Sequence, residues 1–251
     1  MANSKLFCLL PLLFIAAVVL TTQTAMAIII PSVNPIGYNC SNFRNYTINS
    51  KYPNNVDKLL GNLASETPIN DGFSSGSAGQ YIDKVYGLAL CRGDASNTSC
   101  KSCLDYARTA IRQFCSNNQN GIIWYDSCLL KYSEYDFIGK IDNVNKLYLS
   151  SPSPVRNRRG AFLQKRDNLL KQLAVKAAGQ KSFYATDDVK FDESVNVYGL
   201  VQCTRDLSGE DCRKCLNGAI AELPKCCRAQ RGGRVMGGSC IVRYEIYPFY
   251  N

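Results

Sequence analysis

Cysteine is the residue type in this chain whose number and spacing could support chemistry. Thirteen cysteines occur among 251 residues, and two sets of five share the spacing C-x8-C-x2-C-x11-C-x12-C. The sets are Cys91, Cys100, Cys103, Cys115 and Cys128, and Cys203, Cys212, Cys215, Cys227 and Cys240. Each member of the second set follows its counterpart by 112 residues. A repeat this regular indicates two copies of one cysteine-framed unit.

These thiols could pair as disulfides or bind zinc as thiolates. Residues 1–27 predict a secretory signal peptide, with Lys5 before an apolar segment at 6–20 and an A-x-A cleavage site at 25–27. Its removal also removes Cys8 and leaves 13 − 1 = 12 cysteines, an even number that favours disulfides. Exported thiols oxidise, and the sequence has no histidine to complete a zinc site, so we expect no metal. We expect no cofactor either. The mature protein is expected to be secreted and extracellular, without a transmembrane segment.

The absence of histidine also limits catalysis. It removes the Ser-His-Asp and Cys-His arrangements that activate a nucleophile. A pair of carboxylates, as in glycosidases, could still act as acid and base. The acidic residues considered for that role are Asp187, Asp188, Asp192 and Glu193. They share one short polar stretch without a motif, so we interpret them as solvated loop charges and expect no enzymatic activity.

The chain is basic, with a formal net charge of +9. That charge favours acidic partners in general, although a soluble basic protein without such a partner is the simpler interpretation. The densest basic run comprises Arg156, Arg158, Arg159, Lys165 and Arg166. We interpret it as a solvated loop that leads into a helix. Since no aromatic residues alternate with these charges, nucleic acid is not an expected partner.

Three Asn-x-Ser/Thr sequons follow the signal peptide. Their acceptor residues are Asn39, Asn45 and Asn97. In a secreted chain each is a candidate for N-glycosylation. The first sequon contains Cys40, which makes it the weakest of the three.

The pattern of apolar residues predicts an α+β fold in each unit, with two helices packed on one antiparallel sheet. Helices are expected at 56–63, 102–115, 169–177 and 212–223, with Pro68 and Pro224 as stop signals. Strands are expected at 81–91, 122–125, 128–132, 183–191, 195–203, 234–236 and 241–247. Turns or loops are expected around 35–39 and at 71–79, 92–99 and 136–146. With a boundary near residue 140, the two domains are placed at 28–138 and 142–251.

The duplicated cysteine pattern behind a signal peptide, with the closing segment at 243–249, resembles the plant cysteine-rich repeat secretory proteins. Their unit is the ginkbilobin-like, salt-stress/antifungal domain, which also forms the paired ectodomain of cysteine-rich receptor-like kinases and plasmodesmata-located proteins. The resemblance implies two tandem disulfide-framed domains, each a five-stranded antiparallel sheet with two helices. It also implies the pairs Cys40–Cys115, Cys91–Cys100, Cys103–Cys128, Cys203–Cys212 and Cys215–Cys240.

The second unit departs from the family pattern at two positions. The residue 112 positions after Cys40 is Pro152, and an additional Cys226 precedes Cys227. A bond between these neighbours would be strained, because Cα atoms across a trans peptide are about 3.8 Å apart. Two free thiols or a bond to another chain are the alternatives that the sequence leaves open.

Two function classes follow from the resemblance: a mannose-type or cell-wall glycan-binding defence protein, and an apoplastic module that binds proteins. In the mannose-binding relative, the sugar is contacted by an asparagine, an arginine and a glutamate. The corresponding residues of the first unit are Ser41, Ile122 and Ser133. In the second unit the arginine and glutamate roles fall on Arg234 and Glu245, while the asparagine role has no anchor. The alternative interpretation of Arg234 and Glu245 is an exposed ion pair on the surface.

Overall fold

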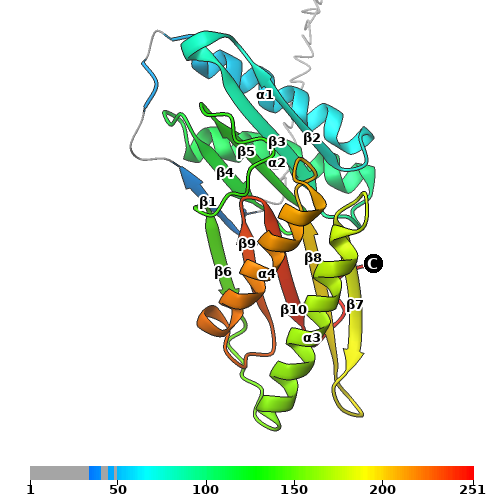
Figure 1. The fold of residues 1–251 in the computed structure, drawn as a ribbon. Coiled ribbons are helices and arrows are strands. Elements are labelled where there is room, and N and C mark those ends of the chain that lie inside the picture. The colour runs from blue at the N-terminus through cyan, green and yellow to red at the C-terminus, as the bar shows by residue number, and fades with distance from the viewer. Residues whose placement is uncertain (1–33, 41–44, 48–49) are drawn as a thin grey trace, which may run out of the picture. The chain divides into compact units, whose positions relative to one another are not determined.

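The computed structural model describes residues 34–40, 45–47 and 50–251, so the predicted signal peptide at 1–27 lies outside the described residues. Within this part the chain forms two five-stranded antiparallel sheets and four α-helices (Figure 1). The α+β prediction, with two helices and one sheet in each repeat, is confirmed. No helix among the described residues is long and apolar enough to cross a membrane.

The first repeat has the strand order β1-β4-β5-β3-β2. Its strands are β1 (Gly37–Cys40), β2 (Phe73–Ala78), β3 (Val85–Cys91), β4 (Gly121–Trp124) and β5 (Cys128–Ser133). Its helices are α1 (Tyr52–Glu66) and α2 (Asn97–Phe114), with short 3-10 turns η1 (Thr67–Ile69) and η2 (Tyr81–Asp83).

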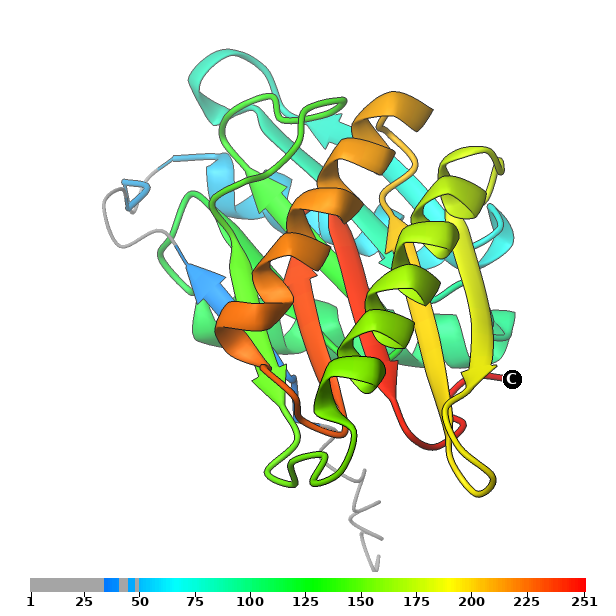
Figure 2. The ribbon, with the colours of Figure 1, turned by 60° about the horizontal axis from the view of Figure 1, so that its bottom comes forward.

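The second repeat has the corresponding order β6-β9-β10-β8-β7. Its strands are β6 (Lys146–Ser150), β7 (Tyr184–Lys190), β8 (Asn196–Cys203), β9 (Gly233–Gly237) and β10 (Cys240–Glu245). Its helices are α3 (Arg159–Ala178) and α4 (Gly209–Cys226). Figure 2 shows both helices lying across one face of this sheet.

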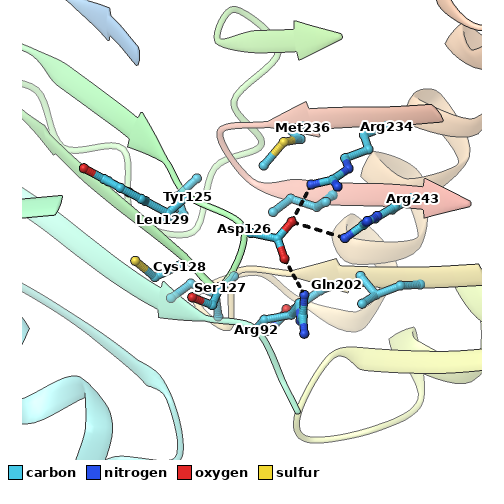
Figure 3. A pocket seen from close by; sticks show the side chains of 13 residues that line it. Arg92, Tyr125, Asp126, Ser127, Cys128, Leu129, Gln202, Arg234, Met236 and Arg243 are labelled. Atoms are coloured by element: carbon cyan, nitrogen blue, oxygen red, sulfur yellow. Dashed lines mark hydrogen bonds and ion pairs between the residues drawn. The ribbon is translucent and has the colours of Figure 1, made fainter. Parts of the chain in front are cut away.

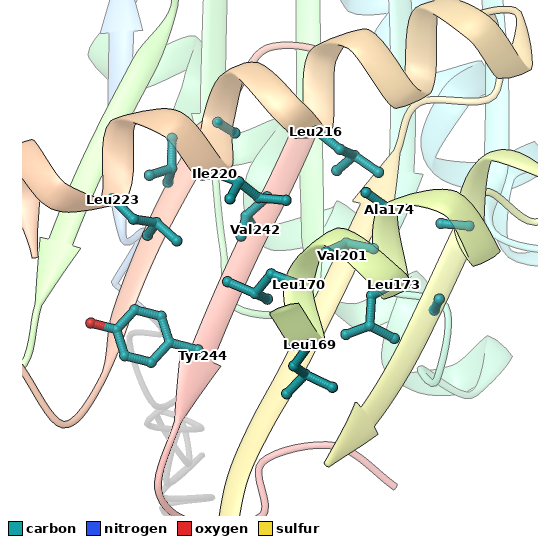
Figure 4. Packing of buried hydrophobic residues seen from close by; sticks show 14 of the residues in the cluster. Leu169, Leu170, Leu173, Ala174, Val201, Leu216, Ile220, Leu223, Val242 and Tyr244 are labelled. Atoms are coloured by element: carbon teal, nitrogen blue, oxygen red, sulfur yellow. The ribbon is translucent and has the colours of Figure 1, made fainter. Parts of the chain in front are cut away.

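Each repeat buries an apolar core between its helices and its sheet. In the second repeat, leucines of α3 and α4 pack on Val201 and Val242 of the central strands (Figure 4). A glycine at the same place in both sheets permits the close approach of the helix. A Cβ on Gly199 would lie 2.8 Å from Leu173 Cδ1, and one on Gly87 would lie 2.9 Å from Leu59 Cδ2. Each glycine follows a tyrosine, Tyr86 or Tyr198, and the two Tyr-Gly pairs are 112 residues apart.

The predicted loops and helix ends need correction in several places. The segment 71–79, expected as a loop, contains β2, whose small residues pair with β3 through the backbone from Phe73↔Leu90 to Ala78↔Val85. The turn-rich segment around residues 35–39 contains β1, and β6 begins where the polar boundary was expected to end. Strand β3 begins only at Val85, after η2, and α2 begins at Asn97 because the Ser96 side chain caps it.

Pro224 does not end the fourth helix, because α4 continues to Cys226. Pro224 has no N–H to donate to the carbonyl one turn earlier. The last turn of the helix still closes, because Cys227 N–H donates to Leu223 O at 2.8 Å. The basic run agrees with its interpretation at Arg156, Arg158 and Arg159, which are exposed where the chain enters α3, but not at Arg166. Arg166 lies within α3, is 1% exposed, and donates to the carbonyl of Arg228 at 2.8 Å.

The described residues contain six disulfides. They are Cys40–Cys115, Cys91–Cys100, Cys103–Cys128, Cys203–Cys212, Cys215–Cys240 and Cys226–Cys227. The first five are the pairs that the family resemblance implied. Of the three outcomes left open for Cys226 and Cys227, the structure contains the bond between neighbours, with Cα atoms 3.8 Å apart.

Strand register identifies the residue that replaces Cys40 in the second repeat. Cys40 pairs with Gly121, and Ser150 pairs with Gly233, which is the counterpart of Gly121 at the offset of 112. Ser150, and not Pro152, therefore occupies the place of Cys40. The fixed offset was misleading there because the segment between this strand and the cysteine triplet is two residues longer in the second repeat.

A third apolar cluster joins the two repeats. Its buried members are Leu88, Leu90, Ile122, Trp124, Leu129 and Met236. Two hydrogen bonds accompany it: Trp124 Nε1 donates to Gly237 O at 3.0 Å, and Gln202 Nε2 donates to Cys91 O at 2.9 Å. Because these contacts join β4 to β9 and β8 to β3, the described residues of both repeats form one compact unit.

Candidate functional site

Asp126 is the centre of a charged cluster at the junction of the two repeats (Figure 3). It lies in the hairpin turn between β4 and β5 of the first repeat. Its Oδ1 accepts from Nη1 of Arg234 at 2.5 Å and of Arg243 at 3.2 Å, and its Oδ2 accepts from Arg92 Nη1 at 2.8 Å. Arg234 on β9 and Arg243 on β10 are direct partners in the antiparallel register. One carboxylate of the first repeat thus binds two guanidinium groups of the second.

Glu245 completes the cluster from the second repeat. Its Oε1 lies 3.0 Å from Arg243 Nε and 3.8 Å from Arg234 Nε. A Cβ on Gly232 would lie 1.8 Å from Glu245 Oε2, so the carboxylate rests against bare backbone. Arg234 and Glu245 thus form an ion pair, as the alternative interpretation expected, but the pair is not exposed, because Glu245 is only 7% exposed.

The charges of the cluster support one another. Burial alone would raise the pKa of Asp126, but the nearby charges of Arg234, Arg243 and Arg92 outweigh it and hold that pKa below its ordinary value. Arg92 also forms a salt bridge with Asp94, with Nε and Oδ1 2.6 Å apart. Three guanidinium groups thus face the three carboxylates of Asp94, Asp126 and Glu245.

The C-terminal segment closes over the same cluster. The guanidinium carbon of Arg243 lies 3.9 Å from the ring centre of Phe249, and the backbone N–H of Asn251 donates to Asp94 Oδ2 at 3.0 Å. The cavity left beside Asp126 has a volume of about 30 Å³. That is room for about one water molecule, and it is too small for a sugar ring.

The structure brings together the two residues that the sequence singled out, Arg234 and Glu245. It also places Asp126, Arg243 and Arg92 with them, and sequence reasoning missed these three. Arg243 could have been found, because it precedes Glu245 by two on one strand and so shares its face. Asp126 could not, because it comes from the other repeat and only the packing of the sheets brings it here.

The asparagine role belongs to the residue directly after the first cysteine, which is Ser41 after Cys40 in the first repeat. Because Ser150 takes the place of Cys40 in the second repeat, the role falls there on Ser151. Its N–H donates to Gly232 O at 2.9 Å. In the first repeat, Ser41 lies outside the described residues, and Ile122 is buried in the cluster that joins the repeats. Ser133 Oγ donates to Asn120 Oδ1 at 2.6 Å.

The remaining predicted residues lie away from this cluster. The sequon residues Asn39, Asn45 and Asn97 are exposed, and their glycosylation stays a prediction. Asp187 and Asp188 lie on the edge strand β7 and not in a loop, whereas Asp192 and Glu193 follow it in a turn. Among the described residues no three or more Cys, Asp or Glu side chains gather into a group that could hold a metal ion.

Comparison with known proteins places the chain in a family. The family model described as "Salt stress response/antifungal" matches residues 39–135 and 150–247. The chain is 50% identical over 216 residues to the antimicrobial ginkbilobin-2-like protein of Castanea crenata, covering 86% of this chain and 89% of that one. It is 42% identical over 254 residues to cysteine-rich repeat secretory protein 38 of Arabidopsis thaliana, covering 99% and 98%.

A solved structure shares the arrangement of the repeats. The tandem DUF26 ectodomain of the Arabidopsis thaliana cysteine-rich receptor-like protein PDLP8 matches with a TM-score of 0.74 and 25% identity, covering 86% of this chain and 100% of that chain. The family model matches twice, once on each sheet with its helices, and the relatives are secretory proteins and extracellular domains. The chain is therefore a secreted, extracellular member of the salt stress response/antifungal family with two DUF26 repeats.

Proposed function

We propose that this protein is a non-enzymatic binding protein outside the cell, that it acts in defence, and that it recognises protein partners with its two repeats held as one unit. The observation that carries the proposal is the position of Asp126. It accepts hydrogen bonds from Arg234 and Arg243 across the repeat junction. Arg234, the arginine expected to contact a sugar, is therefore already bound to a carboxylate of the same chain.

The burial of this cluster supports the protein-binding class over the lectin class. The side chains of Arg234 and Glu245 are 19% and 9% exposed. A sugar hydroxyl would have to replace charge-assisted hydrogen bonds that already exist, and such bonds are stronger than neutral ones. The defence role is supported by the relative from Castanea crenata, whose name describes it as antimicrobial.

A glycan array that includes mannose-terminated glycans tests the proposal, with the mature protein and the variant Glu245→Gln side by side. We expect no saturable binding by either protein. In parallel, immobilised protein is exposed to apoplastic fluid and cross-linked, and we expect one defined partner whose cross-links reach both repeats.

Mannose binding that free sugar competes away and that Glu245→Gln abolishes would overturn the protein-binding proposal and establish the lectin. Because Glu245 is buried beside Arg243, the variant needs a melting curve to show that it is folded. Release of a glycan fragment on the array would contradict the non-enzymatic part.

A further inference from the structure

The second repeat contains a hollow that the first repeat fills with a side chain. It has a volume of about 290 Å³ and lies where the chain enters α3. Its apolar lining comprises Val155, Phe162, Phe191, Val195 and Ile246. Phe162 and Phe191 pack edge to face with ring centres 5.3 Å apart, so they form a rigid floor.

Backbone pairing identifies the missing side chain as that of Tyr46. In the first repeat Tyr46 N–H donates to Asn117 O, and in the second Val155 N–H donates to Ala229 O. Asn117 and Ala229 differ by the offset of 112, so Val155 takes the place of Tyr46.

The neighbouring aromatic residue is retained. Tyr52 begins α1, and Phe162 has its place in α3, because Leu59 and Leu169 contact the equivalent glycines Gly87 and Gly199. In the first repeat the rings of Tyr46 and Tyr52 pack with centres 5.9 Å apart. Phe162 remains fully buried in the second repeat, where Phe191 packs against it, so the hollow lies over this aromatic pair and beside Val155.

The rim of the hollow is positively charged. The side chains of Arg156 and Arg231 line it, both are exposed, and neither guanidinium group has a hydrogen-bond or ion-pair partner among the described residues. The guanidinium carbon of Arg158 lies 5.5 Å from the ring centre of Phe191. The one carboxylate in the lining, Asp192, already accepts from the backbone N–H groups of Ser194 and Val195.

We propose that this hollow binds a small organic anion, an aromatic carboxylate or sulfonate, with its ring against Phe191, Val195 and Ile246 and its anionic group on Arg156 and Arg231. A guanidinium group matches a carboxylate or sulfonate through two parallel hydrogen bonds. The volume lies near the lower end of small-molecule pockets, about 300 to 1,000 Å³, and so selects ligands of one or two rings. The site is separate from the Asp126 cluster and does not rest on the proposed function.

Titration with 2-naphthoate, followed by its own fluorescence or by calorimetry, tests the proposal. We expect saturable binding to the full chain with a Kd of about 1 mM or tighter. The uncharged analogue 2-naphthylmethanol should bind about tenfold more weakly, because it forms no charge-assisted hydrogen bond. Arg231→Gln, which installs the residue of the first repeat at this place (Gln119), should weaken naphthoate binding by a similar factor.

Val155→Tyr should abolish binding by restoring the side chain that fills the first repeat. Val175→Tyr, at an exposed position on α3, is the matched control for this change, and Lys171→Gln is the control for the loss of charge. Both controls should bind as the parent does. If the melting curve shows that Val155→Tyr is not folded, the double variant Arg156→Gln, Arg231→Gln replaces it in the naphthoate titration. This variant changes only exposed side chains.

Absence of saturable naphthoate binding at about 1 mM would overturn the proposal. Equal binding by Val155→Tyr or by the double arginine variant would show that the ligand binds elsewhere. Equal affinity for the alcohol and the carboxylate would refute the role of the arginines.

Discussion

Substitution of Asp126 by asparagine tests whether the charged cluster holds the two repeats together. The change keeps the size of the side chain but removes its charge from three arginines. Asp126 is 53% exposed, so solvent screens part of each interaction, and a fully exposed pair contributes only about 0–1 kcal/mol. Its partner Arg243 is only 8% exposed, and hydrogen bonds to charged groups contribute about 1.5–3 kcal/mol.

We therefore expect Asp126→Asn to lower the free energy of unfolding by about 1–2 kcal/mol at pH 7. For a chain of this size each kcal/mol corresponds to a Tm shift of about 2–4 °C. The assay is thermal unfolding of the oxidised protein as a function of pH. Glu193→Gln is the control, since Glu193 is exposed and has no hydrogen-bond or ion-pair partner among the described residues.

The pH dependence has a definite sign. Because folding lowers the pKa of Asp126, its stabilisation is complete above the unfolded value of about 3.9 and is lost as the pH falls through the folded pKa. The difference in Tm between parent and variant should be constant near neutral pH and should vanish in strong acid. Equal Tm values at pH 7, or a difference that persists at the acid limit, would refute the electrostatic account.

Two further predictions follow from the packing of the repeats. Ser150→Cys combined with Cys226→Ser should form a disulfide between the introduced thiol and Cys227, because Ser150 has the place of Cys40 and Cys227 Sγ lies 3.4 Å from the carbonyl of the preceding Leu149. Peptide mapping without reduction would detect it; a free thiol at position 150 would contradict the equivalence. Gly199→Ala should cost about 1–3 kcal/mol, since the added Cβ would meet Leu173 at 2.8 Å. Gly218→Ala in α4, where no atom lies within 4 Å, should stabilise the protein by up to about 1 kcal/mol in chemical denaturation, and equal effects at both glycines would contradict this reasoning.

The sequence predicted those parts of the fold that depend on local pattern. Apolar periodicity located helices, and short runs rich in apolar residues located the central strands. It missed β2, with its sequence FSSGSA, because small residues have little intrinsic preference for a strand and pairing with β3 decides their structure. It missed β1 for the same reason, since that strand forms by pairing with β4.

The site was predictable only within one repeat. Arg234 and Glu245 could be located because cysteine spacing fixes their places on two neighbouring strands. Their burial and their contact with Asp126 could not, because these depend on which face of each sheet meets the other repeat. The hollow beside Phe162 was invisible for a similar reason, since it is a difference between Tyr46 and Val155 that only the aligned backbones reveal.

The apolar cluster shared by the two repeats has a consequence for how the chain folds during export. Synthesis proceeds from the N-terminus, so the first repeat is complete while the second is still being made. Until β9 arrives, the first repeat must hold Leu90, Ile122 and Trp124 toward solvent, because Met236 and the carbonyl of Gly237 are not yet available to cover them. We therefore expect that a first repeat that folds before the second is complete exposes this apolar face, through which two copies would associate. The second repeat covers this face within the same chain, and residues 134–145, which connect β5 to β6, keep it close to the first repeat.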